Sequence, residues 1–261
     1  MAKSLLSAVD LAVGFKRNTT TVTLLGGLNL ELREGSLVAL LGMNGAGKST
    51  LLRALTGDTQ PLAGTLLYDG RDASSMSIID RARFMGLVST ERVAAGGLTV
   101  TELVEMGRQP YTGFLGRLSR HDHQVVAHAI ESVGMTHKAN EYTASLSDGE
   151  RQKCMIARAL AQETPVIVLD EPTAFLDVAS RIETMQLLSD LAHSQGKAVL
   201  LSSHDISQSI MKCDELWLIT HDREVITGTP QHLIDSNALN RLFPSPSIRF
   251  NPTILDFTHT Q

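Results

Sequence analysis

The sequence predicts an α/β fold in which a mainly parallel sheet forms the core. Three short, continuous apolar runs, residues 37–41, 166–169 and 198–201, have the length and composition of strands that are buried on both faces. Stretches with helical spacing separate these runs, which is the pattern of parallel strands that are joined by helices. Apolar alternation over residues 7–13 and 28–32 predicts a second, smaller sheet with antiparallel strands.

Helix-start signals cluster in the middle of the chain. Residues 99–102, 119–122 and 147–150 each place Ser or Thr three positions before Glu or Asp, which is the spacing of a capping box. The expected helices continue from each of these starts. Helix-rich sequence over about 89–161, set between strands of an α/β core, predicts an inserted helical subdomain.

We therefore expect one domain over residues 1–261. Its core covers about 1–88 and 162–230, and a short tail over about 231–261 is rich in Pro, Ser and Asn and is expected to wrap the surface. A length of 261 residues suits one large domain.

Composition excludes several classes of protein. Hydrophobic residues make up 43% of the chain and charged residues 20%, which is ordinary for a folded protein and excludes a disordered chain or a fibre. The net charge of −5 argues against a nucleic-acid partner. Two cysteines form no spaced framework, and no apolar run approaches the roughly 18 residues of a membrane-spanning helix. These features predict a cytoplasmic protein.

A glycine-rich loop lies between the first buried run and a helical stretch. It fits the pattern G-x-x-x-x-G-K-[ST], and its residues are Gly42, Met43, Asn44, Gly45, Ala46, Gly47, Lys48, Ser49 and Thr50. Glycines let the backbone curl so that its N–H groups point at phosphate oxygens, and the helix N-terminus adds positive potential. Lys48 is predicted to reach the β- and γ-phosphates of a nucleotide, and the Ser49 hydroxyl to bind Mg²⁺.

Two acidic residues and a histidine follow the other two buried runs. Asp170 and Glu171 come directly after residues 166–169, at the strand end where open α/β sheets bind ligands. Asp170 is suited to hold the hydration shell of Mg²⁺, and Glu171 is suited to act as general base on an attacking water. His204, after residues 198–201, is placed to contact the γ-phosphate and that water.

Residues 146–152, Leu-Ser-Asp-Gly-Glu-Arg-Gln, resemble the signature motif of the ATP-binding cassette ATPases, and residues 173–177 resemble the family loop that ends in an aspartate at the dimer interface. The resemblance covers nearly the whole chain and implies a phosphate-loop NTPase core with ATP and Mg²⁺ as ligands. In this family ATP lies between the phosphate loop of one subunit and the signature of another. The chain has one set of motifs, so the resemblance implies a homodimer. The residues that it adds to the nucleotide site are Ser147, Gly149, Glu150 and Asp177.

Two further positions take their expected role from the resemblance. Phe15 stands where the family has an aromatic residue that stacks on adenine, and a place in the core is the alternative. Thr90 stands where the family usually has the glutamine that contacts Mg²⁺ and the attacking water. Because threonine is shorter, the alternatives are help from Glu91, a bridging water or altered coupling. Asp148 replaces a usual glycine and is expected to point away from the nucleotide.

Residues 98–104 and 107–111 resemble the ATPases of bacterial iron-siderophore, heme and vitamin B12 importers. The resemblance implies an ATP-hydrolysing subunit at the cytoplasmic face of the membrane, bound to permease subunits and, through them, to a substrate-binding protein. Residues 89–111 would receive the permease. An importer for another substrate such as metal ions, a non-transport cassette ATPase and a nucleotide switch with poor turnover remain the alternatives.

Overall fold

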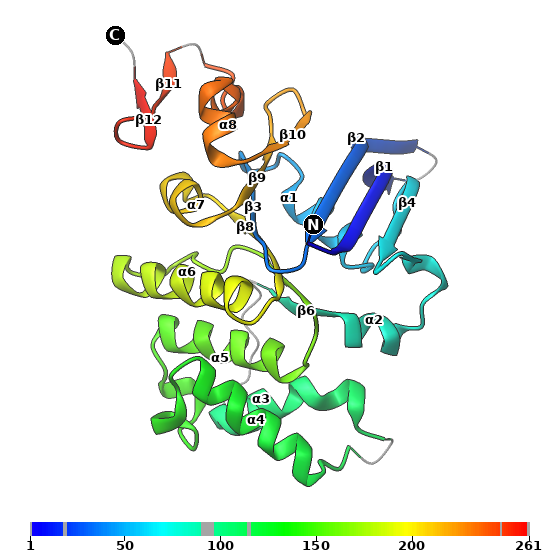
Figure 1. The fold of residues 1–261 in the computed structure, drawn as a ribbon, viewed down its shortest axis with the longest axis vertical. Helices are drawn as coiled ribbons and strands as arrows, with labels where there is room; N and C mark the ends of the chain where they lie inside the picture. Colours follow the sequence, from blue (N-terminus) through cyan, green and yellow to red (C-terminus); the bar gives the residue numbers. More distant parts are fainter. Residues whose placement is uncertain (1, 18–19, 90–96, 114–115, 246, 260–261) are drawn as a thin grey trace.

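A six-stranded sheet forms the centre of the protein (Figure 1). The computed structural model describes residues 2–17, 20–89, 97–113, 116–245 and 247–259. The strands occur in the order β10-β9-β3-β8-β7-β6. Their bounds are β3 Leu37–Gly42, β6 Met85–Val88, β7 Val166–Leu169, β8 Ala198–Ser203, β9 Glu215–Ile219 and β10 Val225–Gly228. All pairs are parallel except β10 with β9. Every residue of β7 and β8 is buried, so the predicted parallel core is confirmed.

The second sheet is antiparallel, as predicted, but its strands are longer than the alternating segments. It has the order β2-β1-β4-β5, with β1 Ser4–Arg17, β2 Thr20–Arg33, β4 Ala63–Tyr68 and β5 Arg71–Asp72. The β1–β2 register shifts between Ala8 and Leu11, where Asp10 has a φ of 49°. Because such a bulge breaks the alternation, the sequence pattern finds only pieces of each strand.

The helical subdomain is built from helices that begin where the capping boxes predict. The boxes at Thr99, Ser119 and Ser147 are all formed. The α-helices are α1 Lys48–Leu55, α2 Ile78–Phe84, α3 Val100–Glu105, α4 Arg120–Ser132, α5 Asp148–Ala161, α6 Val178–His193, α7 Ile206–Lys212 and α8 Pro230–Asp235. The 3₁₀ helices are η1 Ala73–Ser75, η2 Met106–Tyr111, η3 Thr136–Lys138, η4 Thr143–Ser145 and η5 Ala238–Leu242. Helices α3, α4 and α5 pack on one another, in green below the sheet in Figure 1.

The C-terminal residues differ from the expected surface tail. They form α8, η5 and a hairpin of β11 Ile248–Asn251 and β12 Asp256–His259. Leu233, Leu239 and Leu242 are buried in the main core, so this segment is folded onto the domain by apolar burial. In the described part of the chain, no helix combines the length and the apolar character needed to cross a membrane.

Candidate nucleotide site

The glycine-rich loop joins β3 directly to α1, as the sequence predicts. Gly45 and Gly47 have φ values of 78° and 111°, in the left-handed region that glycine adopts without strain. Gly47 is the N-cap of α1 and has no side chain that could accept a hydrogen bond. The first backbone N–H groups of the helix are therefore not capped by a side chain. Ser49 is exposed in the first turn of α1. The loop therefore has the form of an anion-binding helix start.

Lys48 is held beside this loop rather than in solvent. Its side chain is 5% exposed, and its ammonium donates a 2.9 Å hydrogen bond to the carbonyl of Gly42. The same Nζ lies 4.0 Å from Oε1 of Glu171 and 3.4 Å from Nε2 of His204. Burial lowers the pKa of Lys48, and the carboxylates of Glu171 and Asp170 oppose that shift. The lysine is thus partnered inside the chain, beside the glycine-rich loop.

The two acids after β7 share a buried serine that the sequence analysis did not single out. Strands β7 and β8 pair in parallel with Leu169 opposite Leu201, which puts Ser202 beside the acids. The Ser202 hydroxyl donates a 2.6 Å bond to Oδ1 of Asp170 and accepts a 2.8 Å bond from the backbone N–H of Glu171. Glu171 has a φ of 49°, which is uncommon for a residue with a side chain. The sequence carries no local signal for this contact, because it depends on the register of two strands that pair only in the fold.

His204 completes the cluster at this edge of the sheet. It follows β8 and its Nε2 lies 2.5 Å from Oε1 of Glu171. Because β3, β8 and β7 are neighbours, their carboxyl ends bring Lys48, His204 and Glu171 together. A cavity of about 340 Å³ lies beside Glu171 and His204, and Phe175 and Asp256 line it as well. The geometry suits a carboxylate base with two polar neighbours around a bound phosphate.

The signature residues form a separate group at the start of α5. Ser147 caps the helix, and the carboxylate of Glu150 accepts a 3.0 Å hydrogen bond from the backbone N–H of Ser147. Lys138 lies 2.9 Å from the same carboxylate, and this hydrogen bond, with the Ser147 N–H, lowers the pKa of Glu150 to about 2. A Cβ added to Gly149 would lie 2.6 Å from Oγ of Ser180. Within the described residues, no hydrogen bond or ion pair joins this group to the glycine-rich loop.

Asp177 caps α6 by accepting a 2.7 Å hydrogen bond from the N–H of Ser180. Hydrogen bonds with the backbone and side chain of Ser180 lower the pKa of Asp177. Next to it, Phe175 is 84% exposed and Val178 is 70% exposed. Phe15 is 47% exposed on β1, so it does not belong to the buried core. Thr90 and Glu91 lie outside the described residues, and their roles stay predictions.

Comparison with known proteins places the chain in a family. Residues 25–174 match the family model described as ABC transporter. The chain is 39% identical to the cobalamin import ATP-binding protein of Halobacterium salinarum over 84% of its own length, but spans only 55% of that relative. It is 34% identical to the ferric enterobactin transport ATP-binding protein of Escherichia coli K12, over 83% of this chain and 80% of the relative.

Solved structures agree with the sequence matches. A metal-chelate type ABC transporter in an inward-facing conformation has a TM-score of 0.80 and 30% identity, over 98% of this chain and 96% of that one. A dimeric bacterial ABC transporter cassette has a TM-score of 0.74 and 26% identity, over 87% and 99%. The chain belongs to the ABC transporter family, as one of its ATP-hydrolysing cassettes.

Proposed function

We propose that this protein is the ATP-hydrolysing subunit of a bacterial importer for an iron complex or cobalamin. The arrangement of Lys48, Glu171 and His204 around one corner of the sheet carries the ATPase part of the proposal. The substrate class is supported by the named relatives, which are ATP-binding proteins of ferric enterobactin transport and cobalamin import. Glu171 would take a proton from the attacking water, His204 would orient that carboxylate, and Lys48 would hold the transferred phosphate.

The donors next to the phosphate loop fit Mg²⁺. Ser49 and Asp170 offer a hydroxyl and a carboxylate, which are hard oxygen ligands. Among the described residues no group of three or more His, Cys, Asp and Glu side chains could enclose a metal. Mg²⁺ usually keeps several waters and is bound through one or two carboxylates together with substrate phosphates. When bound, Mg²⁺ neutralises charge on the β- and γ-phosphates.

A second copy of the chain would complete the site. Among the residues that the structure describes, no hydrogen bond joins Ser147 and Gly149 to their own glycine-rich loop, yet they offer an anion site at a helix start. Beside Asp177, the apolar side chains of Phe175 and Val178 are largely exposed, as expected of a surface that a partner covers. A head-to-tail homodimer, like the dimeric cassette of similar fold, would bury them and place ATP between two chains.

Permease subunits would bind near residues 89–111. This contact would hold the protein at the cytoplasmic face of the membrane. Leu87 on β6 is 42% exposed and Met106 at the start of η2 is 37% exposed, so apolar contacts are available just before this region and within it. A substrate-binding protein would act through the permease. Arg108 and Gly107 are buried, however, and do not offer a docking contact themselves.

Affinity purification from detergent-solubilised membranes, with mass spectrometry of the bound proteins, tests this proposal. A polytopic membrane protein in stoichiometric amount supports the importer, and its sequence narrows the substrate. Recovery with ribosomes or DNA-associated proteins instead would exclude it. In parallel, Glu171→Gln should abolish steady-state ATP hydrolysis while nucleotide binding persists. The matched control is Glu183→Gln, which removes only an exposed ion pair with Lys153.

A further inference from the structure

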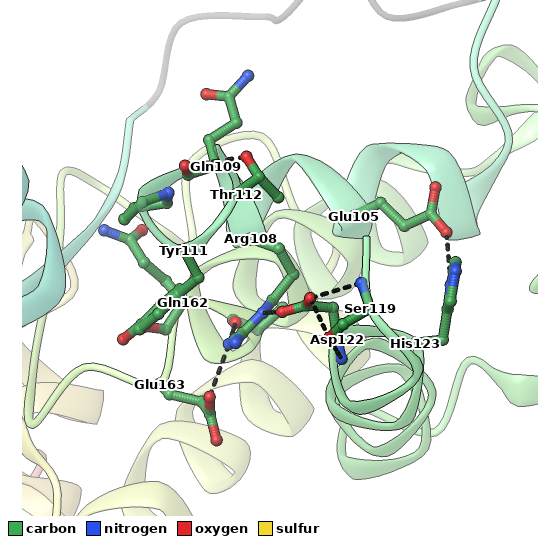
Figure 2. Close-up of polar contacts among 12 residues, drawn as sticks. Glu105, Arg108, Gln109, Tyr111, Thr112, Ser119, Asp122, His123, Gln162 and Glu163 are labelled. Carbon is green, nitrogen blue, oxygen red and sulfur yellow. Dashed lines mark hydrogen bonds and ion pairs between the residues drawn. The ribbon is translucent and has the colours of Figure 1, made fainter. Parts of the chain in front are cut away.

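A buried arginine network occupies the part of the chain expected to contact the permease (Figure 2). Arg108 is only 2% exposed. Its Nε donates a 2.8 Å bond to Oδ1 of Asp122, and its Nη1 donates 2.7 Å bonds to the carbonyl of Ala161 and to Oε2 of Glu163. The second carboxylate oxygen of Asp122 accepts hydrogen bonds from the backbone N–H and the hydroxyl of Ser119, as part of the capping box of α4. One guanidinium therefore joins η2 to the start of α4 and to the end of α5.

Gly107 and Tyr111, which also belong to η2, contact the C-terminal end of α5 as well. A Cβ on Gly107 would lie 2.2 Å from the carbonyl oxygen of Arg158, so only glycine allows this approach. The Tyr111 hydroxyl donates a 3.0 Å bond to the carbonyl of Gln162, the C-cap of α5. The Arg108 guanidinium stacks 4.1 Å from the centroid of the Tyr111 ring. Three residues of η2 thus fix it to the C-terminal end of α5.

Such a network supplies geometry more than stability. Buried ion pairs lose much of their attraction to desolvation, whereas a guanidinium fork holds its partners at defined angles. The outer side of η2 stays available, since Met106 and Gln109 are exposed. Helix α5 is 14 residues long, which is about 21 Å, and Ser147 is its N-cap. Because η2 is bonded to the C-terminal end of this continuous helix, a displacement of η2 would be passed on to α5.

We propose that Arg108 is a positioning residue: it locks η2 to the C-terminal end of α5, so that the placement of η2 sets the placement of Ser147 at the other end. This inference rests on the proposed function, because Ser147 matters for turnover only if it contacts ATP in the homodimer. A force that displaces η2 from its exposed side would be transmitted along α5 to the nucleotide.

The test uses the purified full chain and compares kcat for Mg-ATP, ADP affinity by calorimetry, and Tm. Arg108→Lys keeps the charge but loses the fork, and Tyr111→Phe removes one hydroxyl. Tyr68→Phe is the matched control, because it removes a 2.6 Å bond from a tyrosine hydroxyl to Leu55 at the end of a different helix. We expect Arg108→Lys to lower kcat at least about fivefold and Tyr111→Phe about two- to threefold. ADP affinity, which reports the glycine-rich loop of a single chain, should stay within about twofold.

Wild-type kcat in folded Arg108→Lys and Tyr111→Phe overturns the positioning role, and so does an equal loss of kcat in Tyr68→Phe. If Arg108→Lys does not fold, Tyr111→Phe decides. Ser147→Ala distinguishes a failure of the proposed homodimer from a failure of the role of Arg108. An unchanged kcat in Ser147→Ala contradicts the ATP-bridged dimer itself, whereas a reduced kcat there, with normal kcat in the η2 variants, contradicts only the role of Arg108.

Discussion

Replacing Ser202 with alanine should damage ATP hydrolysis although Ser202 carries no charge and is fully buried. The hydroxyl is the common partner of both acids at the end of β7: it donates to Asp170 and accepts from the backbone of Glu171. Ser202→Ala leaves the Glu171 N–H without that partner and releases one oxygen of Asp170. Because Glu171 has a φ of 49°, the backbone is then free to relax toward a common conformation.

The size of the effect follows from these two bonds. An unsatisfied buried N–H costs about 1–3 kcal/mol, and a hydrogen bond to a charged group contributes about 1.5–3 kcal/mol. Solvent and rearrangement recover part of this, so we expect unfolding to become easier by about 2 kcal/mol, which lowers Tm by about 4–8 °C. If a similar free energy is lost in the orientation of Glu171, kcat falls at least about tenfold.

Steady-state phosphate release at saturating Mg-ATP, together with thermal unfolding, measures both effects. Ser209→Ala is the matched control, since Ser209 is equally buried and donates its 2.7 Å bond to the carbonyl of Asp205, away from the acids. It should lower Tm with kcat unchanged. A kcat for Ser202→Ala within twofold of the parent would refute the view that this hydroxyl positions Glu171.

Three further outcomes are expected. Phe15→Ala should weaken ATP binding about tenfold in a fluorescence titration with no change in Tm, since the ring is exposed and one stacked base contributes about 1–3 kcal/mol. Gly149→Ala should reduce kcat because its methyl meets Ser180, and Ser180→Gly in the same chain should restore it. The pKa of Glu150 is lowered from 4.5 to about 2, so its stabilisation is complete above about pH 4.5 and is lost as pH falls toward 2. The Tm difference between Glu150→Gln and the parent should therefore be larger at pH 6 than at pH 3.5.

Local sequence determined the parts of this protein whose chemistry lies within a few residues. The glycine spacing around Lys48 requires a left-handed turn that only glycine adopts readily, and the structure has it. Capping boxes at Thr99, Ser119 and Ser147 satisfy backbone donors from three residues away, so they predict helix starts without knowledge of the fold. Glu171 was likewise predicted at a strand end, because apolar runs of that length are buried strands.

Contacts between distant segments were decided only by the tertiary structure. The register of β7 against β8 put Ser202 beside the acids, and no spacing along the chain encodes the pairing of Glu171 with a residue 31 positions away. Arg108, expected on a docking surface, is buried because Asp122 on α4 and Glu163 in the turn after α5 neutralise it. A charge can enter the interior only where its partners converge, and that convergence is a property of packed helices rather than of a motif.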